Sequence, residues 1–470
     1  MRKPIQYQMP QYQPVAGHLP PITIRDFKGI NTFDPFSIPD NMFTDIENFT
    51  TSDYPTLTVR PGYTVLGSAI GSKVIGLGSW KDEEIHAVFN DGTWRKWNGS
   101  TWQTLKSGLD TSAEWTFVNY QGGTWADKNL VGSNGVDGLH RYDGSTVQTF
   151  GDAPSDINFV CSYQNRIWGA SGATLHACAL DRPEDWQDFA GTEEDSFFKD
   201  VESSRGENNN MLSGGLTKLV IGFPNSVREL YGGVPSDFND RLITEDEGFA
   251  NNKSAVTHEG IMHFMHKVGF FQYTGGVIPD KTFSEIVDDF YPSITDQSAA
   301  GTDGTRVYFN LPPDTLLVYD ARVDVQTWTV WKGIQATRLI LFNHELHIGD
   351  AQGRVLKLGG TTDAGADISA YAITKPFTSQ SAAQKQKWIK LWTHWELAAG
   401  STLNIYLSDS ESKDDWELMK TITGIGEKID RIVIPIGRFS LANMIRIKFE
   451  VTGWAKMREY TRQIRLLPLY

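Results

Sequence analysis

The stretch Asp91-Gly-Thr-Trp-Arg-Lys-Trp-Asn-Gly-Ser-Thr-Trp102 returns in altered form as Asp137-Gly-Leu-His-Arg-Tyr-Asp-Gly-Ser-Thr-Val147. Fainter copies follow at residues 225–232, 269–275, 315–320 and 353–359. The aromatic residue or leucine near the end of each copy serves as a marker, and the markers are Trp97, Tyr142, Tyr231, Tyr273, Tyr319 and Leu358. Successive markers are 45, 89, 42, 46 and 39 residues apart, and the step of 89 spans two repeats whose missing marker falls near residues 175–178.

A period of about 40–45 residues built from short strands is typical of a β-propeller, in which each repeat forms one small sheet. The 44 glycines and turn pairs such as Asp91-Gly92, Asp143-Gly144 and Asp303-Gly304 suit a fold with many hairpins. The sequence therefore predicts an all-β fold with a β-propeller of about seven blades over residues 68–360. The expected blades cover residues 70–105, 113–150, 156–190, 211–248, 252–291, 297–332 and 335–360.

The residues before the repeats, 1–67, are predicted to form an extended N-terminal arm and a lead-in strand. Residues 1–20 are rich in Pro, Gln and Tyr, a composition that stays disordered alone and becomes ordered against a partner. A propeller must join its first and last blades. Residues 57–65 alternate like a strand around Pro61-Gly62, and we expect them to close the ring by pairing with the final blade.

After residue 360 the sequence changes character, and residues 361–470 are predicted to form a C-terminal β-sandwich. Residues 361–368 are rich in Gly, Asp and Ala and indicate a linker. Longer runs with apolar residues at every second position follow. These runs lie at residues 388–397, 402–407, 431–436, 444–451 and 462–467.

The charge balance limits the kinds of partner. The net charge is −14, which makes the chain a poor general binder of nucleic acid but allows DNA to slide past an acidic wall. Basic residues alternate with apolar ones in the C-terminal region, which places them on an outer face. They are either solvated or in contact with the acidic propeller of a neighbouring copy. They are Lys385, Lys387, Lys390, Arg446, Lys448, Arg458, Arg462 and Arg465.

An acidic, Asn-rich insertion at residues 192–210 separates the third and fourth expected blades. It is longer than a usual connection and is expected to project from one face as a contact loop. Its candidate interaction residues are Glu193, Glu194 and Asp195. A solvated loop and a calcium site are the alternatives for these three acids.

The sequence predicts no catalytic, cofactor-binding or metal-binding residues. His263 and His266, and likewise His344 and His347, are three residues apart, which places each pair on opposite faces of a strand. The acidic pairs Asp288-Asp289 and Asp414-Asp415 share no common blade position, unlike the paired carboxylates of glycosidases. The segment Asn90-Asp-Gly-Thr-Trp94 lacks the spacers of a sialidase aspartate box.

Cys161 and Cys178 lie in apolar runs and are expected to be buried free thiols, with a disulfide across one hairpin as the alternative. The repeated aromatics are expected to pack between blades rather than to stack on sugars. The N-terminus has no signal-peptide pattern and no apolar run is long enough to span a membrane, so the chain is expected to be made in a reducing cytoplasm.

Several stretches carry a resemblance to a known family: Ile24-Arg-Asp-Phe-Lys-Gly-Ile-Asn31, Ile38-Pro-Asp40, Asp45-Ile-Glu-Asn48, Leu57-Thr-Val-Arg-Pro-Gly-Tyr63, Leu317-Val-Tyr-Asp-Ala-Arg322 and Gln326-Thr-Trp-Thr-Val-Trp331. With an extended lead-in, a propeller and a terminal sandwich, the chain resembles the packaged-DNA stabilisation proteins of short-tailed phages, also called tail hub or nozzle proteins. The architectural resemblance covers the whole chain, and its motifs lie at residues 24–63 and 317–331.

The resemblance implies a structural virion protein rather than an enzyme. It implies a homo-oligomeric ring of six copies below the portal and adaptor, assembled in the host cytoplasm. The ring would retain packaged DNA and conduct it at ejection without sequence-specific contact. The N-terminal arm, with Tyr7 and Tyr12, and the 192–210 insertion would then hold neighbouring subunits together. The alternative is a glycan-binding or glycan-hydrolysing propeller with an attached sandwich module.

Overall fold

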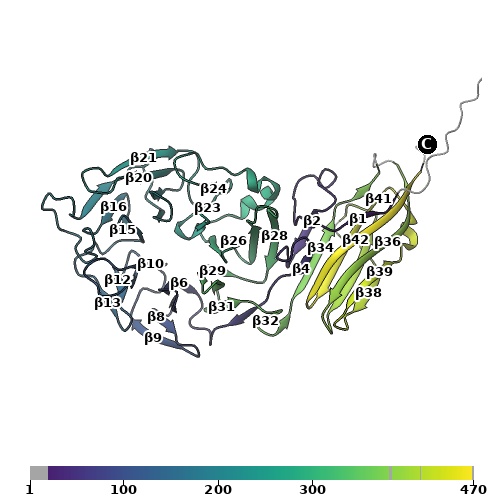
Figure 1. Ribbon diagram of the computed structural model, residues 1–470, viewed down its shortest axis with the longest axis horizontal. Coiled ribbons are helices and arrows are strands. Elements are labelled where there is room, and N and C mark those ends of the chain that lie inside the picture. The colour runs from purple at the N-terminus through teal and green to yellow at the C-terminus, as the bar shows by residue number, and fades with distance from the viewer. Residues whose placement is uncertain (1–19, 380–383, 413, 468–470) are drawn as a thin grey trace, which may run out of the picture.

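The computed structural model describes residues 20–379, 384–412 and 414–467. Strands dominate these residues, whose helical structure is limited to the short 3₁₀ segments η1 (Asn252–Ser254), η2 (Thr282–Ser293) and η3 (Gly437–Ser440). The strands form many small antiparallel sheets in a propeller-like arrangement, so the predicted all-β class is confirmed (Figure 1). In the described part of the chain, no helix is both long and apolar enough to cross a membrane.

Small sheets follow one another along the chain and curve into a ring (Figure 1). In most of them the strands lie in chain order, so each strand forms a hairpin with the next. The first four sheets contain β6 (Val74–Trp80), β7 (Glu84–Phe89), β8 (Thr93–Trp97) and β9 (Trp102–Ser107); β10 (Thr116–Tyr120), β11 (Asn129–Ser133), β12 (His140–Tyr142) and β13 (Val147–Thr149); β14 (Phe159–Tyr163), β15 (Arg166–Ser171), β16 (Thr174–Ala177) and β17 (Phe197–Asp200); and β18 (Met211–Ser213), β19 (Leu219–Gly222), β20 (Val227–Tyr231) and β21 (Asn239–Thr244).

The ring continues with a three-stranded sheet, a four-stranded sheet and a mixed sheet in which β5 joins the last hairpin. These contain β22 (Ala255–His258), β23 (Ile261–His266) and β24 (Gly269–Tyr273); β25 (Ala299–Thr302), β26 (Arg306–Leu311), β27 (Thr315–Asp320) and β28 (Thr327–Lys332); and β29 (Ala336–Phe342), β30 (Glu345–Asp350), β31 (Val355–Leu358), β5 (Tyr63–Val65), β32 (Thr362–Asp363) and β33 (Ala366–Asp367).

The sequence markers occupy one structural position. Trp97, Tyr142, Tyr231, Tyr273 and Leu358 each end the third strand of their sheet, and Tyr319 is the next-to-last residue of the third strand β27. The marker missing from the series is accounted for by β16, the third strand of its sheet. The repeat therefore reports a hairpin unit that recurs around the ring, as its period predicts.

Aromatic side chains fill the space between neighbouring sheets, as expected. Trp94 of the β6–β9 sheet is fully buried and contacts Trp115, which directly precedes β10, with ring centroids 5.5 Å apart. Phe117 of β10 lies against Gly78 of β6, where an added Cβ would come within 2.9 Å of the ring. Tyr273 is likewise buried, whereas Trp97 and Tyr231 remain partly exposed.

Ring closure uses only half of the segment expected to provide it. Tyr63–Val65 (β5) pairs with β31, as predicted. Leu57–Val59 (β4) instead pairs with β42 (Ala455–Leu466) of the C-terminal region. The chain changes sheets at Pro61-Gly62, because proline cannot donate to a ladder. An added Cβ at Gly62 would lie 2.0 Å from the carbonyl oxygen of Thr362.

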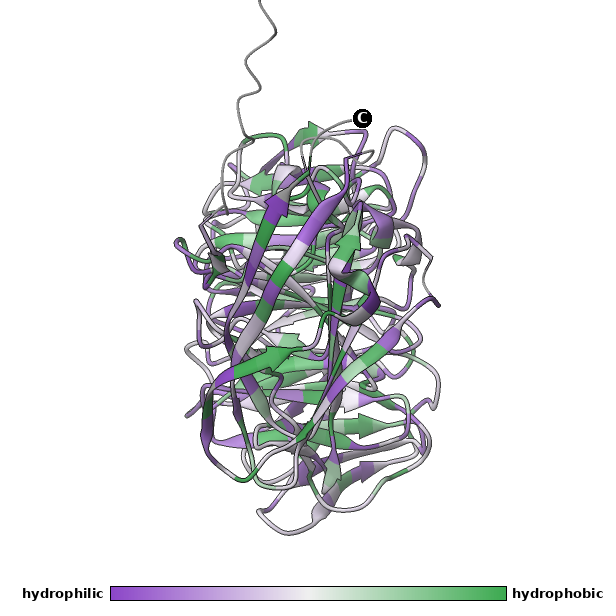
Figure 2. Cartoon of the chain, turned by 90° about the vertical axis from the view of Figure 1, so that its right-hand side faces the viewer, coloured by the Kyte–Doolittle hydropathy of each residue, from purple (hydrophilic) through white to green (hydrophobic). Residues whose placement is uncertain are grey.

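The C-terminal region contains two larger sheets whose inward residues share one core, including Trp395, Phe449 and Tyr460. Hydrophobic and hydrophilic residues alternate along their long strands (Figure 2). The N-terminal strands complete both sheets. One sheet contains β1 (Ile22–Ile24), β3 (Phe49–Thr50), β4, β42, β36 (Gln386–Leu397), β39 (Lys428–Ile434) and β40 (Leu441–Ala442); the other contains β2 (Phe43–Glu47), β34 (Ser369–Thr374), β35 (Phe377–Thr378), β37 (Thr402–Ser408), β38 (Glu417–Thr423) and β41 (Met444–Thr452).

The two segments that carry the family resemblance lie against each other. Ile30 donates its backbone N–H to the carbonyl of Trp328 at 2.8 Å, and Trp331 donates its indole N–H to the carbonyl of Phe49 at 3.0 Å. The Thr51 and Thr327 hydroxyls are 2.6 Å apart. Residues 24–63 therefore bind the free edge of β28 and join the ring to the two larger sheets.

One of the expected sheets differs from the prediction. Phe197–Asp200, inside the expected 192–210 insertion, forms β17 and pairs with β16, so this part completes a sheet instead of projecting from the molecule. The sheet of β22–β24 has three described strands, and η2 follows it. Trp328 donates its indole N–H to the carbonyl of Phe283 in η2 at 2.9 Å, which fixes η2 against the neighbouring sheet.

Candidate binding site in the central cavity

A cavity of about 930 Å³ lies where the first strands of the small sheets meet. β6 lies beside β10, β10 beside β14 and β14 beside β18; on the other side β22 lies beside β25, β25 beside β29, and β29 beside β6. Each strand contributes lining residues, so the cavity follows the axis of the ring. We call it the central cavity.

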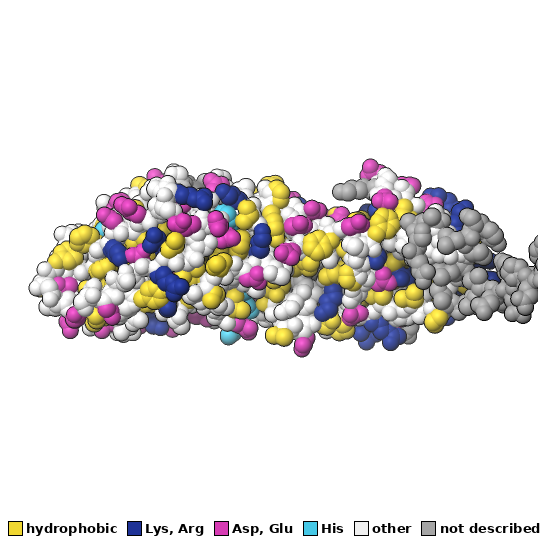
Figure 3. All heavy atoms as spheres, turned by 90° about the horizontal axis from the view of Figure 1, so that it is seen from above, with side chains coloured by type: hydrophobic (Ala, Val, Ile, Leu, Met, Phe, Trp, Pro, Cys, Tyr) yellow, Lys and Arg dark blue, Asp and Glu magenta, His cyan; other side chains and the backbone are white. Residues whose placement is uncertain are grey.

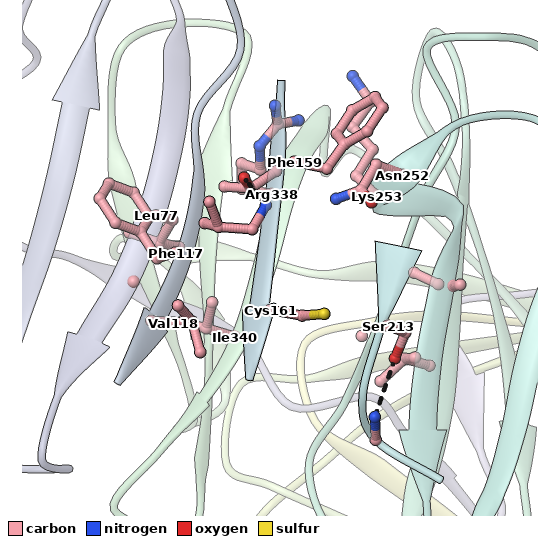
Figure 4. Close-up of a pocket in the computed structure, with 18 of the residues that line it drawn as sticks. Leu77, Phe117, Val118, Phe159, Cys161, Ser213, Asn252, Lys253, Arg338 and Ile340 are labelled. Carbon is pink, nitrogen blue, oxygen red and sulfur yellow. Dashed lines mark hydrogen bonds between the residues drawn. The ribbon is translucent and has the colours of Figure 1, made fainter. Parts of the chain in front are cut away.

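The middle of the central cavity has a largely apolar wall of small and medium side chains. Val118, Cys161 and Ile340 line it in Figure 4, and Gly78 and Ala300 also contribute. Narrow side chains leave room along the axis where several first strands converge. A volume of this size is in the range of small-molecule binding pockets.

One end of the central cavity carries a charged cluster centred on Glu114. Lys253 contacts both carboxylate oxygens at 2.8 Å. Arg338 Nη2 lies 2.9 Å from Glu114 Oε2, and Lys73 Nζ lies 3.0 Å from Oε1. The side chains of Lys253 and Arg338 are only 8% and 9% exposed. We call Lys73, Lys253 and Arg338 the mouth cations.

The charges of this cluster influence one another. Burial opposes ionisation of Glu114, but Arg338 and Lys253 outweigh it and hold the pKa of this carboxyl well below its ordinary value. Burial, together with repulsion from Arg338, lowers the pKa of Lys253 to about 8, although Glu114 acts in the opposite direction. Glu114 is therefore ionised at neutral pH, and Lys253 titrates just above neutrality.

Local structure fixes the positions of the mouth cations. Lys253 lies in η1, whose N-cap Asn251 accepts the Lys253 backbone N–H at 2.8 Å. The Asn251 amide donates to the carbonyls of Asp296 and Ser298, both at 2.8 Å. Arg338 follows a register shift at the start of β29 and donates from Nη1 to the Thr337 carbonyl. The cluster is thus held by backbone contacts from several sheets.

The opposite end of the central cavity is polar but less charged. The lining residues at the ends of the first strands include Ser79, Asn119, Ser162, Ser213 and Thr257. Ser213 Oγ accepts the backbone N–H of Gly215 at 3.2 Å. The cavity is therefore asymmetric along its axis, with hydroxyl groups at one end and ionised groups at the other.

Sequence reasoning missed the Glu114 cluster. Its members come from four segments that no motif connects, and Glu114 and Lys253 are 139 residues apart. A usable signal existed, because each member lies just before, or near the start of, the first strand of a sheet. Aligning the repeats at that position rather than at the third strand would have brought the four residues together.

The predicted acidic interaction residues occupy different environments. Glu193 accepts a hydrogen bond from Ser236 at 2.9 Å, and Glu194 is exposed. Asp195 is buried, and its carboxylate accepts hydrogen bonds from the backbone N–H groups of Gly191 and Thr192. Asp195 therefore stabilises its own loop instead of forming part of an exposed acidic surface.

The predicted basic interaction residues also occupy different environments. Arg446 and Arg462 are buried, in contrast to the outer face expected for them. Arg446 lies over the ring of Trp416, and Arg462 pairs with Asp40 at 2.5 Å. Because each can cover its charge with a neighbouring ring or acid, the alternating pattern did not guarantee exposure.

Lys448 pairs with Glu450 at 2.9 Å, and Arg465 is exposed on β42. Acidic and basic side chains are interspersed along the face shown in Figure 3. Tyr7 and Tyr12 lie outside the described residues.

The other chemically notable residues lie outside the Glu114 cluster. Cys161 and Cys178 are buried free thiols, as predicted. His263 and His266 are buried in β23. Asp288 in η2 accepts a hydrogen bond from the Thr32 hydroxyl at 3.2 Å. Among the residues that the structure describes, no group of three or more His, Cys, Asp or Glu side chains is placed to hold a metal ion.

No protein-family model matches the chain, and no curated protein matches it significantly. Solved structures with some similarity include the computationally designed Ika8 protein, with a TM-score of 0.40 and 13% identity over 63% of this chain and 100% of that one. The Pan2 WD40 domain of Neurospora crassa gives a TM-score of 0.42 and 8% identity over 64% of this chain and 96% of that one. The extracellular domain of a hybrid two component system from B. thetaiotaomicron gives a TM-score of 0.45 and 13% identity over 77% of this chain and 48% of that one.

Proposed function

We propose that the chain is a structural component of a phage virion tail, built as a seven-bladed β-propeller with a C-terminal β-sandwich. In this role several copies of the chain form a homo-oligomeric ring, distinct from the ring of sheets within one chain, that extends the channel of the portal and adaptor. This homo-oligomeric ring retains packaged DNA and conducts it at ejection. The proposed partners are other copies of the chain, the portal or adaptor and other tail proteins, with DNA passing without sequence-specific contact.

The observation that carries the proposal is the contact between the two segments on which the family resemblance rests. Residues 24–63 run between the ring of sheets and the two larger sheets and bind the free edge of β28, which contains part of the second motif. Motifs that are distant in sequence are thus parts of one structural joint. A joint that fixes the ring of sheets against the two larger sheets suits a protein that forms the wall of a channel and must carry load.

The charge distribution also supports this role. The net charge of −14 would disfavour tight binding of a DNA strand sliding along the protein. The cavity carboxylate Glu114 is already engaged by three cations. That arrangement differs from the acid–base or acid–nucleophile carboxylate pair that glycosidases use, and so favours a structural role over hydrolysis.

Electron microscopy tests the proposal directly. The purified full chain and virions that contain it would be imaged, with a gold-labelled antibody against the chain. We expect label at the tail below the portal and a ring built from several copies. Label absent from the tail, or confined to a host-contacting fibre tip, would contradict the nozzle role.

A glycan-binding propeller, the second candidate, is favoured by one surface feature. Phe189 and Phe198 are 54% and 60% exposed, with ring centroids 5.5 Å apart and an edge-to-face arrangement. Exposed aromatic rings can stack on sugars. Binding of the chain to host polysaccharide that is lost in F189A/F198A but kept in V323A, which alters another exposed apolar residue, would support this candidate.

A further inference from the structure

The end of the central cavity that holds Glu114 carries more positive than negative charge. Three mouth cations surround this one carboxylate, which is the only Asp or Glu among the described residues that line the cavity. If all three cations are protonated, the cluster carries a net charge of +2. Two of them are more than nine-tenths buried, so water screens them poorly.

Buried charges are costly unless partners of opposite charge compensate them. Lys253 shows this cost, because burial and the neighbouring Arg338 lower its pKa to about 8 in spite of Glu114. A further negative group at this position would offset the repulsion among the mouth cations. The cluster is therefore electrostatically incomplete with Glu114 alone.

The mouth cations also have the donors that an anion needs. An ammonium group has three N–H donors, and the two oxygens of Glu114 are the described acceptors of Lys253. Lys73 likewise contacts Glu114 and the Gln297 side chain. Arg338 uses Nη1 on the Thr337 carbonyl and Nη2 on Glu114, and a guanidinium has five donors. Lys253 and Arg338, which line the cavity, thus keep unused donors, and Lys73 reaches the same carboxylate from just outside the lining.

The cavity wall suits the remainder of a small ligand. Lys253, Arg338 and Phe159 lie toward one end of the view in Figure 4, and Val118, Cys161 and Ile340 lie farther along the cavity. A molecule with one negative group could place it among the cations and extend along the apolar wall. The volume of about 930 Å³ admits a ligand of that size.

We propose that Lys73, Lys253 and Arg338 bind an oxyanion, a carboxylate or phosphate group carried by a small molecule that enters the central cavity. This site is separate from the ring-forming role proposed above and does not depend on it. Binding would add charge-assisted hydrogen bonds to buried cations, which are stronger than neutral ones. Binding would also favour protonated Lys253 and so take up protons near pH 8.

Isothermal titration at low ionic strength and pH 7 tests the site with inorganic phosphate and with glucuronate as probes. Glucose serves as the uncharged match for glucuronate, and equal ionic strength is kept with chloride. Heat from phosphate alone would assign a phosphate site, and heat from glucuronate alone would assign a carboxylate site. Absence of binding for both probes would overturn the proposal.

Variants that change the charge in opposite directions sharpen the test. K253M/R338M should weaken binding at least tenfold, whereas E114Q, which removes the competing carboxylate, should strengthen it about tenfold. K357Q removes a lysine that pairs with Glu345, neither of which lines the cavity, and should bind as the unaltered chain does. Equal affinity in K253M/R338M and the unaltered chain would contradict the proposal.

Two measurements keep the test decisive if K253M/R338M does not fold. Lys73 is 32% exposed, so K73Q should fold and should weaken phosphate binding several-fold. Titrations near pH 8 in buffers of different ionisation enthalpy should also reveal proton uptake on binding. Unchanged affinity in K73Q together with no proton uptake would overturn the site.

Discussion

Arg60 and Asp363 form a two-pronged ion pair between the lead-in segment and the end of the ring. Arg60 Nη1 lies 2.8 Å from Asp363 Oδ1, and Nη2 lies 2.7 Å from Oδ2. The Arg60 side chain is 1% exposed and also donates from Nε to Asn48 at 2.9 Å. This residue sits between β4 and β5, where the chain leaves one sheet for another. The pair therefore fixes the segment in which the chain passes from the larger sheet that contains β4 to the ring sheet that contains β5.

We expect Arg60→Met to lower the free energy of unfolding by about 3 kcal/mol, because it removes the partner of Asp363, whose side chain is only 20% exposed, and the donor to the Asn48 side chain. Urea unfolding followed by tryptophan fluorescence measures the change. Arg95→Gln is the control, since Arg95 and Asp91 form a partly exposed pair close in sequence, of a kind worth less than about 1 kcal/mol. Equal losses in the two variants would show that the crossing does not depend on Arg60.

The repeat could be predicted because its signal is local. Trp97 and Tyr142 end equivalent strands, and a tight turn follows each of them. Hairpins between neighbouring strands leave a pattern in short stretches of sequence. Phe197–Asp200 escaped prediction because a long irregular connection separates β17 from β16, its partner in the same sheet. No tight turn between β16 and β17 signals in the sequence that these two strands pair.

The candidate site could not be predicted for a related reason. Glu114, Lys253 and Arg338 each look like an ordinary charged residue in its own segment. Only the curvature of the ring brings them together, and nothing local in the sequence records that curvature. Arg462 shows the same limit, because its burial depends on Asp40, which lies more than 400 residues away.

Gly29 is expected to be indispensable for the contact between the lead-in and β28. It has a φ of 73°, and an added Cβ would lie 2.1 Å from the Trp328 carbonyl oxygen. Gly29→Ala should lower the free energy of unfolding by about 3 kcal/mol or more, because the backbone strain of an alanine at positive φ adds to the steric overlap with the Trp328 carbonyl. Gly99→Ala is the matched control, with a φ of 95° and no atom within 4 Å of the added Cβ. Urea unfolding should show a clearly larger loss for Gly29→Ala.

The two thiols should be inert until the chain unfolds. Cys178 is fully buried, and burial raises its pKa to about 12, so the reactive thiolate is scarce at neutral pH. Burial also raises the pKa of Cys161 well above its ordinary value. We expect a disulfide-exchange reagent such as Ellman's to react slowly with the folded chain and with two thiols per chain in urea. Rapid reaction of the folded C161S variant would contradict the burial of Cys178.

Stability should fall as the pH falls through the range in which His263 and His266 resist protonation. Burial is the main cause that lowers the pKa of each to about 4; His258 adds to the effect at His263, and Lys267 at His266. Between about pH 6.5 and 4, the unfolded chain binds protons that the folded chain does not, so unfolding is favoured. Above that range the stabilising effect is complete. Each histidine should lower the free energy of unfolding by about 3 kcal/mol by pH 4.

Urea unfolding between pH 7.5 and 4.5 should therefore show a shallower pH dependence in His266→Leu. His344→Gln alters an exposed histidine and should keep the slope of the unaltered chain. An unchanged slope in His266→Leu would assign the acid sensitivity to other groups.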